Sequence, residues 1–335
     1  MDSPRVSDLG EFGLIDRLRR RLASSVAPGA ETGVEIGPGD DAAAVDTGAS
    51  TLLAADMLVE GIHFDLAVSS PSDAGYKAVA VNASDMAAMG GYTHYLLVSV
   101  GLPASVPVAT VDALYDGLLE AAADCGAAIV GGDVTRAPVI VVSVAAAGGP
   151  GPAGVVRRSG AREGDVLCVT GSLGAAAAGL RLLRADHDPG RLLEAFPSLA
   201  AAHRRPAARI AAGPAAAVAG ATAMIDVSDG FARDAAHIAE ESGLGLVVDA
   251  SSIPVAAGVA DAATLLGAEP AVFAASGGDD YELAMAVPPD RVAAVRAAIA
   301  PLPLTVAGAF GGTDRVFLHA RGSIPLSELG WEHFR

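Results

Sequence analysis

Residues 223–230 read Ala-Met-Ile-Asp-Val-Ser-Asp-Gly. The first three residues are apolar, which is typical of a short buried strand, and residues 229–241 are expected to form a helix. Asp226 and Asp229 therefore stand where a strand ends and a helix begins. Free backbone N–H groups at a helix start favour an anion, although Ser228 is equally well explained as an ordinary helix N-cap. The segment thus indicates both a strand–helix unit and a candidate binding site.

The same alternation of strand and helix extends outward from this segment through most of the chain. Alternating elements of this kind are typical of a layered α/β protein, so the predicted fold class is α/β. The expected strands are 51–55, 95–102, 128–130, 139–147, 166–169, 223–225, 246–248 and 282–287, and the expected helices are 72–89, 108–125, 229–241 and 289–299, with an alanine-rich helix after Gly174.

A run rich in glycine and proline, Gly148 to Gly154, interrupts this pattern near the middle of the chain. Such residues favour turns and connections, so we expect a linker there and two α/β domains, residues 1–150 and 151–335. The run also matches the pattern Gly-x-Gly-x-x-Gly of dinucleotide-binding proteins. Two prolines interrupt the match and no suitable helix follows it, so a linker is the better interpretation.

The chain has 335 residues with 22 basic and 39 acidic side chains, and its formal net charge is -17. All but one of the basic residues are arginine, and Lys77 is the single lysine. A Walker phosphate loop needs Gly-x-x-x-x-Gly-Lys followed by Ser or Thr. Lys77 lacks this frame, so nucleotide binding by that route is excluded. An acidic chain with few cations also cannot neutralise a run of phosphates, so a nucleic acid is not an expected partner.

The sequence favours a cytoplasmic protein. Its longest apolar stretches are broken by glycine, proline or arginine and fall short of the ~20 apolar residues of a spanning helix, so no membrane association is expected. The segment Met1 to Arg5 lacks the basic and apolar regions of a signal peptide. Cys125 and Cys168 lie far apart in apolar surroundings, which disfavours a disulfide framework.

Many of the aspartates stand beside glycines or at strand ends instead of on polar helix faces. Each alone is explained as well by an ordinary turn, because Asp and Gly are favoured there. As a set they are better explained by several hard cations, since Mg²⁺ is held by carboxylates together with water and phosphate oxygens. Asp85 adds a carboxylate on a helix, on the same face as Asn82. The segments concerned are Gly39 to Asp41, Ala55 to Met57, Gly131 to Asp133, Asp226 to Gly230 and Gly277 to Asp280.

With these motifs in order, the sequence resembles the thiamine-monophosphate kinase family, a part of the aminoimidazole-ribonucleotide synthetase-like superfamily. The resemblance implies an enzyme that uses ATP to convert thiamine monophosphate to thiamine diphosphate, the last step of cofactor biosynthesis. It also implies a homodimer in which the N-terminal domain binds ATP and Mg²⁺ and forms a dimeric sheet, while a C-terminal α/β domain completes the site. The segments that carry the resemblance are residues 10–15, 39–42, 56–64, 76–90, 131–136, 158–160, 226–230, 276–283 and 330–334.

The resemblance further implies a role for each matching residue. Several Mg²⁺ ions would be held by Asp41, Asp56, Asp85, Asp133, Asp226 and Asp229. Three of these metal holders, with no general base, would be essential for catalysis: Asp85, Asp133 and Asp226. ATP would contact Gly132, Asp133, Arg158 and Ser228. Thiamine monophosphate would contact His63, Asp279 and Trp331.

Without the resemblance, His63 would be taken as an ordinary strand or loop histidine and Trp331 as a core or tail anchor. Two positions depart from the family pattern. A hydroxyl pair usually precedes the aspartate that matches Asp56, and here both positions are alanine, Ala54 and Ala55. Asp279 replaces the usual glutamate, so its carboxylate has a shorter reach towards the substrate.

The chemistry of the implied reaction needs little from a base. The acceptor is a phosphate monoester whose second pKa is about 6, so it is already ionised near neutral pH. We therefore expect direct in-line phosphoryl transfer without a phosphoenzyme. The alternatives left open are another ATP-using enzyme of the superfamily, such as the purine cyclo-ligase, and a non-catalytic relative that only binds Mg²⁺ or nucleotide.

Overall fold

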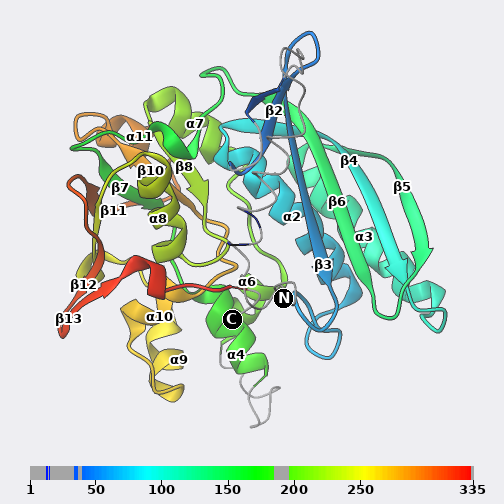
Figure 1. Cartoon of the computed structure of the whole chain (residues 1–335). Helices are drawn as coiled ribbons and strands as arrows, with labels where there is room; N and C mark the ends of the chain where they lie inside the picture. Colours follow the sequence, from blue (N-terminus) through cyan, green and yellow to red (C-terminus); the bar gives the residue numbers. More distant parts are fainter. Residues whose placement is uncertain (1–12, 14, 16–33, 37–39, 185–195, 333–335) are drawn as a thin grey trace, which may run out of the picture.

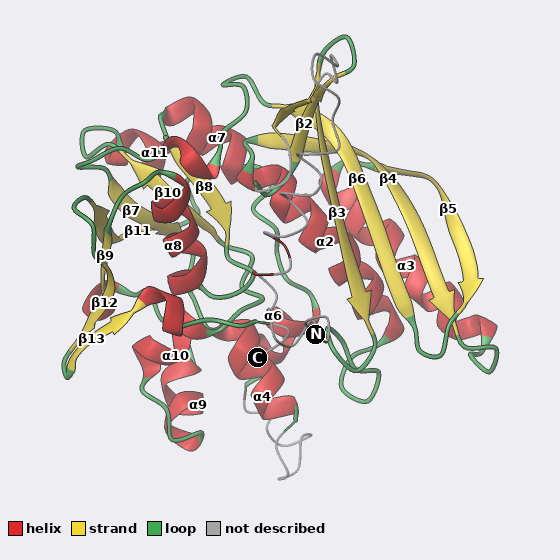
Figure 2. Ribbon diagram, viewed as in Figure 1, coloured by secondary structure: helices red, strands yellow, loops and turns green. Residues whose placement is uncertain are grey.

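The computed structural model describes residues 13, 15, 34–36, 40–184 and 196–332 of the chain. Within them, two β-sheets stand side by side, each packed against helices (Figure 1; Figure 2). The first sheet has six strands in the order β1-β2-β3-β6-β4-β5, and the second has seven in the order β13-β12-β9-β11-β7-β10-β8. Neighbouring strands are antiparallel except for two parallel pairs, β4 with β5 and β9 with β12. The expected α/β class is confirmed.

The first sheet is built from residues before Gly151, with two long helices packed on one face. Its strands are β1 (Val34–Ile36), β2 (Ala43–Asp46), β3 (Ser50–Val59), β4 (Gly91–Leu102), β5 (Ala128–Arg136) and β6 (Val141–Pro150), and its helices are α2 (Pro71–Ala88) and α3 (Val108–Cys125). The two helices meet at Gly75 and Gly117, where an added Cβ atom would collide with a backbone carbonyl of the facing helix. This close contact fixes α2 and α3 as one unit.

Side chains of the first sheet alternate between a helix-covered face and a face that no described helix covers. Leu52 and Leu58 of β3 are buried in the core with α2 and α3. Met57 of β3 is 55% exposed on the other side, and Tyr95 and Leu97 of β4 are 56% and 50% exposed. We call this second side the open face. Its apolar character is unusual for a surface in contact with water.

The second sheet is covered on both faces. Its strands are β7 (Val166–Thr170), β8 (Ala223–Asp226), β9 (Leu246–Asp249), β10 (Leu283–Val287), β11 (Leu304–Phe310), β12 (Arg315–His319) and β13 (Gly322–Pro325), and its helices are α4 (Ala175–Leu183), α6 (Pro197–Arg204), α7 (Ala212–Ala219), α8 (Phe231–Glu241), α9 (Val259–Leu265), α10 (Pro270–Ser276) and α11 (Val292–Ala298). Ala284 of β10 packs with Phe231 of α8 on one face. Met285 packs with Val295 of α11 on the other.

Helix α2 belongs to both halves of the molecule. Its last residue, Ala88, packs in the same core cluster as Ala216 of α7 and Met224 of β8. Gly213 lies so close to α2 that an added Cβ atom would collide with the carbonyl oxygen of Ala87. The C-terminal end of α2 is therefore fixed against the second sheet, and Figure 1 shows α2 between the two sheets.

The expected linker is wrong in its first half, because β6 continues through Pro150. Gly148 pairs with Leu52 of β3 and with Thr93 of β4. A Cβ atom at Gly148 would collide with the carbonyl oxygen of Tyr92, so this glycine serves close strand packing and not chain flexibility. The domain ranges 1–150 and 151–335 remain a prediction.

The other expected strands and helices are present, some with shifted ends. The helix expected from residue 229 begins at Phe231, which leaves Asp226 to Gly230 as a loop. The sequence reading missed several short elements, namely β1, β2, β11, β12, β13, α6, α7, α9 and α10. The family segments at residues 10–12, 14, 39 and 333–334 lie outside the described residues. None of the described helices combines the length and apolar composition that a bilayer crossing requires.

Candidate functional site

Helix α2 positions a carboxylate at its C-terminal end. The helix begins with a capping box, in which Ser70 Oγ accepts from the Asp73 N–H at 3.1 Å and Asp73 Oδ2 accepts from the Ser70 N–H at 3.0 Å. Asp85 lies in the last turn, where the partial negative charge of the helix end disfavours another negative group. A carboxylate in this place is costly unless a cation compensates it.

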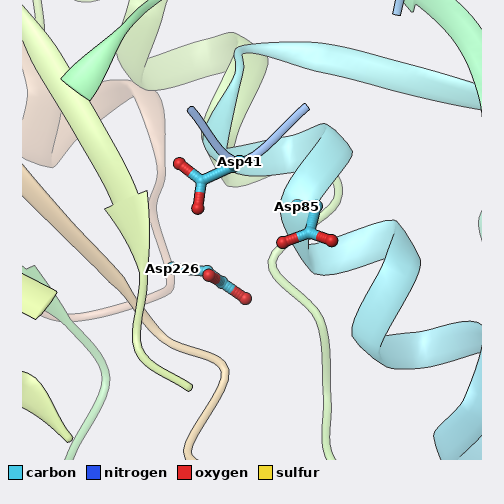
Figure 3. A group of neighbouring side chains, drawn as sticks. All are labelled: Asp41, Asp85 and Asp226. Atoms are coloured by element: carbon cyan, nitrogen blue, oxygen red, sulfur yellow. The ribbon is translucent and has the colours of Figure 1, made fainter. Parts of the chain in front are cut away.

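Three elements bring their carboxylates to one point, the loop before β2, the end of α2 and the end of β8. Carboxylate oxygens of Asp41, Asp85 and Asp226 all lie within 4.8 Å of one another. Figure 3 shows the three side chains extending into the same space. Asp56 of β3 adjoins them, since its carboxyl group and that of Asp85 each affect the pKa of the other.

Burial and mutual repulsion shift the titration of this cluster. Burial, followed by the charge of a neighbouring aspartate, raises the pKa of both Asp85 and Asp226 well above the ordinary value. Burial likewise raises the pKa of Asp56. Each shift means that the folded chain resists holding these groups as anions together. Oxygen ligands at this spacing suit a hard divalent cation, which would relieve the repulsion.

Arg158, in the short helix η1 (Arg158–Gly160), supplies the positive side chain beside the cluster. Its Nη2 and Nε donate to the two carboxylate oxygens of Asp41 at 2.7 and 3.1 Å, a bidentate pair that joins the two halves of the chain. Its backbone N–H donates to Asp40 Oδ1 at 3.2 Å. Burial and the charge of Asp41 still raise the pKa of Asp40 to about 6.

Hydrogen bonds from its backbone N–H groups hold the loop after β8 in place. Asp234, buried in α8, accepts the N–H groups of Asp229 and Gly230, each at 3.1 Å. The helix N-cap is Gly230, so the interpretation of Ser228 as an N-cap is wrong. Trp331 donates its backbone N–H to the Asp229 carbonyl at 2.8 Å. Asp229 and Trp331 are therefore neighbours, and the Trp331 side chain is 59% exposed beside the loop.

The residues expected to contact thiamine monophosphate are brought together in part. Lys77 Nζ of α2 donates to Asp279 Oδ2 at 2.7 Å and to the His63 carbonyl at 3.2 Å, so the three residues form one group. Asp280 points elsewhere, because its Oδ2 accepts the Gly174 N–H at 2.8 Å at the start of α4. Sequence reasoning missed this role of Lys77. The available signal was a charged residue in an otherwise apolar helix segment.

Within one copy of the chain, Gly132 and Asp133 lie away from the cluster of Asp41, Asp85 and Asp226. They belong to β5, the edge strand, and both are exposed. The register pairs Asp133 with Ser99, which is exposed on the open face, whereas Asp56 lies two strands further along. The two alanines that depart from the family pattern are also divided, since Ala54 is buried in the helix-covered core and Ala55 is exposed on the other side. A hydroxyl pair at 54 and 55 would therefore face in opposite directions.

Comparison with known proteins places this arrangement in a class. Residues 39–149 match the family model for the AIR synthase related protein, N-terminal domain, and residues 162–320 match that for the C-terminal domain. The chain is therefore an AIR synthase related protein. Within that class it belongs to the thiamine-monophosphate kinase family, as the following relatives show.

The thiamine-monophosphate kinase of Mycobacterium tuberculosis (strain ATCC 25618 / H37Rv) is 40% identical over 99% of this chain and 94% of its own length. That of Aquifex aeolicus (strain VF5) is 33% identical over 98% of this chain and 100% of its own length. The solved structure described as AaThiL complexed with AMPPCP and TMP has a TM-score of 0.84 and 32% identity, and covers 99% of this chain and 100% of that one.

The repulsion in the cluster leads to a stability prediction for Asp85→Asn. Because the folded pKa of Asp85 is raised above its unfolded value, folding binds a proton and stability falls as pH rises from about 4 towards the folded pKa. In EDTA at pH 8 the variant should be more stable than the wild type by about 1 kcal/mol or more, and the difference should shrink towards pH 4. Added Mg²⁺ should raise the melting temperature of the wild type much more than that of the variant.

Urea unfolding across this pH range measures the effect. Asp116→Asn, at an exposed aspartate of α3, is the matched control. It should change neither the stability in EDTA nor the rise in melting temperature caused by Mg²⁺. A variant less stable than the wild type in EDTA at pH 8 would contradict the account of a repulsive cluster.

Proposed function

We propose that the chain transfers the terminal phosphoryl group of ATP to thiamine monophosphate and so makes thiamine diphosphate. The observation that carries this proposal is the Asp41–Asp85–Asp226 cluster at the junction of two sheets, in a chain of this family. The ligands of the related solved structure, AMPPCP and TMP, support ATP as co-substrate and thiamine monophosphate as acceptor. The intact cluster favours this reading over that of a non-catalytic relative.

The donor set fits Mg²⁺, because three carboxylates converge and their charges repel one another without a cation. Asp41, Asp85 and Asp226 would hold ions directly, Asp56 would join them through its contact with Asp85, and Asp229 would hold a further ion. Bound Mg²⁺ supplies charge neutralisation for the phosphates that must approach one another.

The side chains of the site then act mainly by positioning. The acceptor phosphate is already ionised, so no residue has to remove a proton, and we propose direct in-line transfer without a phosphoenzyme. Arg158 uses Nε and Nη2 on Asp41, and its remaining N–H donors can contact a nucleotide phosphate. Ser228 lies in the loop that follows Asp226, where it would also contact ATP.

The organic part of thiamine monophosphate would lie against His63, Asp279 and Trp331. A cationic thiazolium ring gains attraction from an aromatic face, and the indole of Trp331 is exposed enough to offer one. The negative charge of Asp279 suits the same cation. Lys77 lowers the pKa of Asp279, although burial opposes the shift, so this carboxylate is charged at neutral pH.

We propose further that two copies of the chain pair through their open faces. The apolar side chains of β3 and β4 on this face are about half exposed, and the edge strand β5 continues the surface. A second copy would bury this surface with the same residues on each side, as a symmetric dimer requires. Gly132 and Asp133 would then lie in the interface. We propose that they contact the nucleotide bound by the partner copy.

The two free cysteines support a cytoplasmic location, which we also propose. Domain ranges of 1–150 and 151–335 complete the proposal, the first for the dimeric sheet and the second for the rest of the nucleotide and substrate site.

An assay of ADP release tests the reaction. With ATP and Mg²⁺, the wild type should release ADP only when thiamine monophosphate is present. Asp85→Asn should lower the turnover by at least about 100-fold, because it removes a ligand on which transition-state charge compensation depends. Asp116→Asn should keep the wild-type rate. Wild-type ADP release that does not respond to thiamine monophosphate would count against this acceptor.

Oligomeric state tests the open face. Leu97→Glu places a charge at a residue that is 50% exposed on this face, and it should convert a dimer to a monomer in sedimentation or light scattering. Leu119→Glu is the matched control, since Leu119 is 55% exposed on α3. A wild type that is monomeric at micromolar concentration, or a Leu97→Glu variant that remains dimeric, would exclude pairing through this face.

Mixing two inactive variants tests whether the site is shared. If Asp85 and Asp133 act in one site from different copies, a mixed dimer of Asp85→Asn with Asp133→Asn contains one intact site. Random pairing should then restore about one quarter of the wild-type activity, because half of the dimers are mixed. If both residues act within one copy, no mixed dimer has an intact site and the mixture stays inactive.

A further inference from the structure

The single lysine of the chain is buried between the two halves of the molecule. Its side chain is only 3% exposed, whereas that of its partner Asp279 is 31% exposed. A buried ammonium group is tolerated only with close partners, and Lys77 has the Asp279 carboxylate at 2.7 Å and the His63 carbonyl at 3.2 Å. A ligand can therefore reach Asp279 but not Lys77.

The loop that carries Asp279 has an unusual backbone. Asp279 and Tyr281 both have positive φ, 66° and 49°, which is uncommon for residues other than glycine. Such conformations persist only where surrounding contacts fix them. The N–H groups of Asp279 and Tyr281 donate to the carbonyls of Ser228 and Val227, each at 2.8 Å, and thus tie this loop to the loop after β8.

Both carboxylate oxygens of Asp279 already have partners within the protein. Oδ1 accepts from the Tyr281 hydroxyl at 3.1 Å, and Oδ2 accepts from Lys77. His203 Nδ1 lies 3.6 Å from Oδ2, too far for a hydrogen bond, and burial lowers the pKa of His203 towards the neutral form. The close positive charge that holds Asp279 is therefore that of Lys77.

Lys77 also links this group to the metal cluster through α2. Asp85 follows Lys77 by eight residues, which is about 12 Å along a helix. The helix thus carries a cluster suited to phosphate and metal near one end and the Lys77 pair further towards its N-terminus. A substrate with a phosphate at one end and a cationic ring system further along would lie across both.

We propose that Lys77 is a positioning residue for thiamine monophosphate, which fixes the Asp279 carboxylate relative to α2 and thereby sets the affinity for this substrate. The inference rests on the proposed function and adds a residue to it. Lys77 does not touch the substrate in this scheme, and its effect is transmitted through Asp279.

A second charged hydrogen bond between α2 and the second half of the chain provides a matched control. Arg205, just after α6, donates through Nε to Asp73 Oδ1 at 2.7 Å, near the start of α2. Arg205 therefore also connects α2 to a segment of the second half. It contacts neither His63 nor Asp279 through any of its hydrogen bonds, which go to Asp73, Glu120 and Ser72. Loss of Arg205 should lower stability without a specific effect on substrate affinity.

Steady-state kinetics of Lys77→Met test the inference. Loss of a charged hydrogen bond of this kind should raise the KM for thiamine monophosphate roughly 10-fold or more, with the KM for ATP changed less than about 2-fold. The double variant Lys77→Met/Asp279→Asn should have a KM no higher than that of the worse single variant, because both changes interrupt one path. Arg205→Met should leave both KM values unchanged while its melting temperature falls.

Three results would overturn the inference: an unchanged KM for thiamine monophosphate, an equal rise in both KM values, or full additivity in the double variant. If Lys77→Met does not fold, the double variant takes its place, because it leaves no unpaired charge. Its KM for thiamine monophosphate should then equal that of Asp279→Asn. Failure of the double variant to fold would make Lys77 a structural residue and end the proposal. Wild-type turnover, measured in parallel, separates these outcomes from a failure of the proposed function.

Discussion

Repulsion among three carboxylates is the constraint on which the rest of the structure depends. Asp41, Asp85 and Asp226 come from a loop, a helix end and a strand end, and their oxygens lie within 4.8 Å of one another. Their charges oppose this arrangement, so packing elsewhere has to maintain it. The buried end of α2 in the core of the second half and the Arg158–Asp41 pair supply that support. The cluster is therefore locally destabilising, and its oxygens are spaced as a hard cation would require.

The site is formed where the two sheets meet, from residues of both halves of the chain. Each half contributes acidic residues, yet the positive side chains cross from one half to the other. Arg158 of the second half reaches Asp41 of the first, and Lys77 of the first reaches Asp279 of the second. These attractive pairs flank the repulsive cluster. The relative position of the two sheets is therefore specified by charge as well as by apolar packing.

Much of this could be predicted from the sequence, because local rules govern it. Strand–helix alternation and glycine-flanked aspartates depend on neighbouring residues, and they indicated the fold class and the residues of the cluster. Three features depend on long-range register and could not be read locally. Asp133 lies across the sheet from the cluster, Gly148 pairs within β6 and not in a linker, and Lys77 finds its partner 202 positions away.

The glycine contact between α2 and α3 has a mechanical consequence. Because Gly75 and Gly117 allow the two helix backbones to touch, α2 has no room to slide or rotate on its own sheet. Asp85 and Lys77 therefore both lie on a helix whose position against α3 is fixed. Any adjustment of the site to ligands of different length therefore falls to the loops around it.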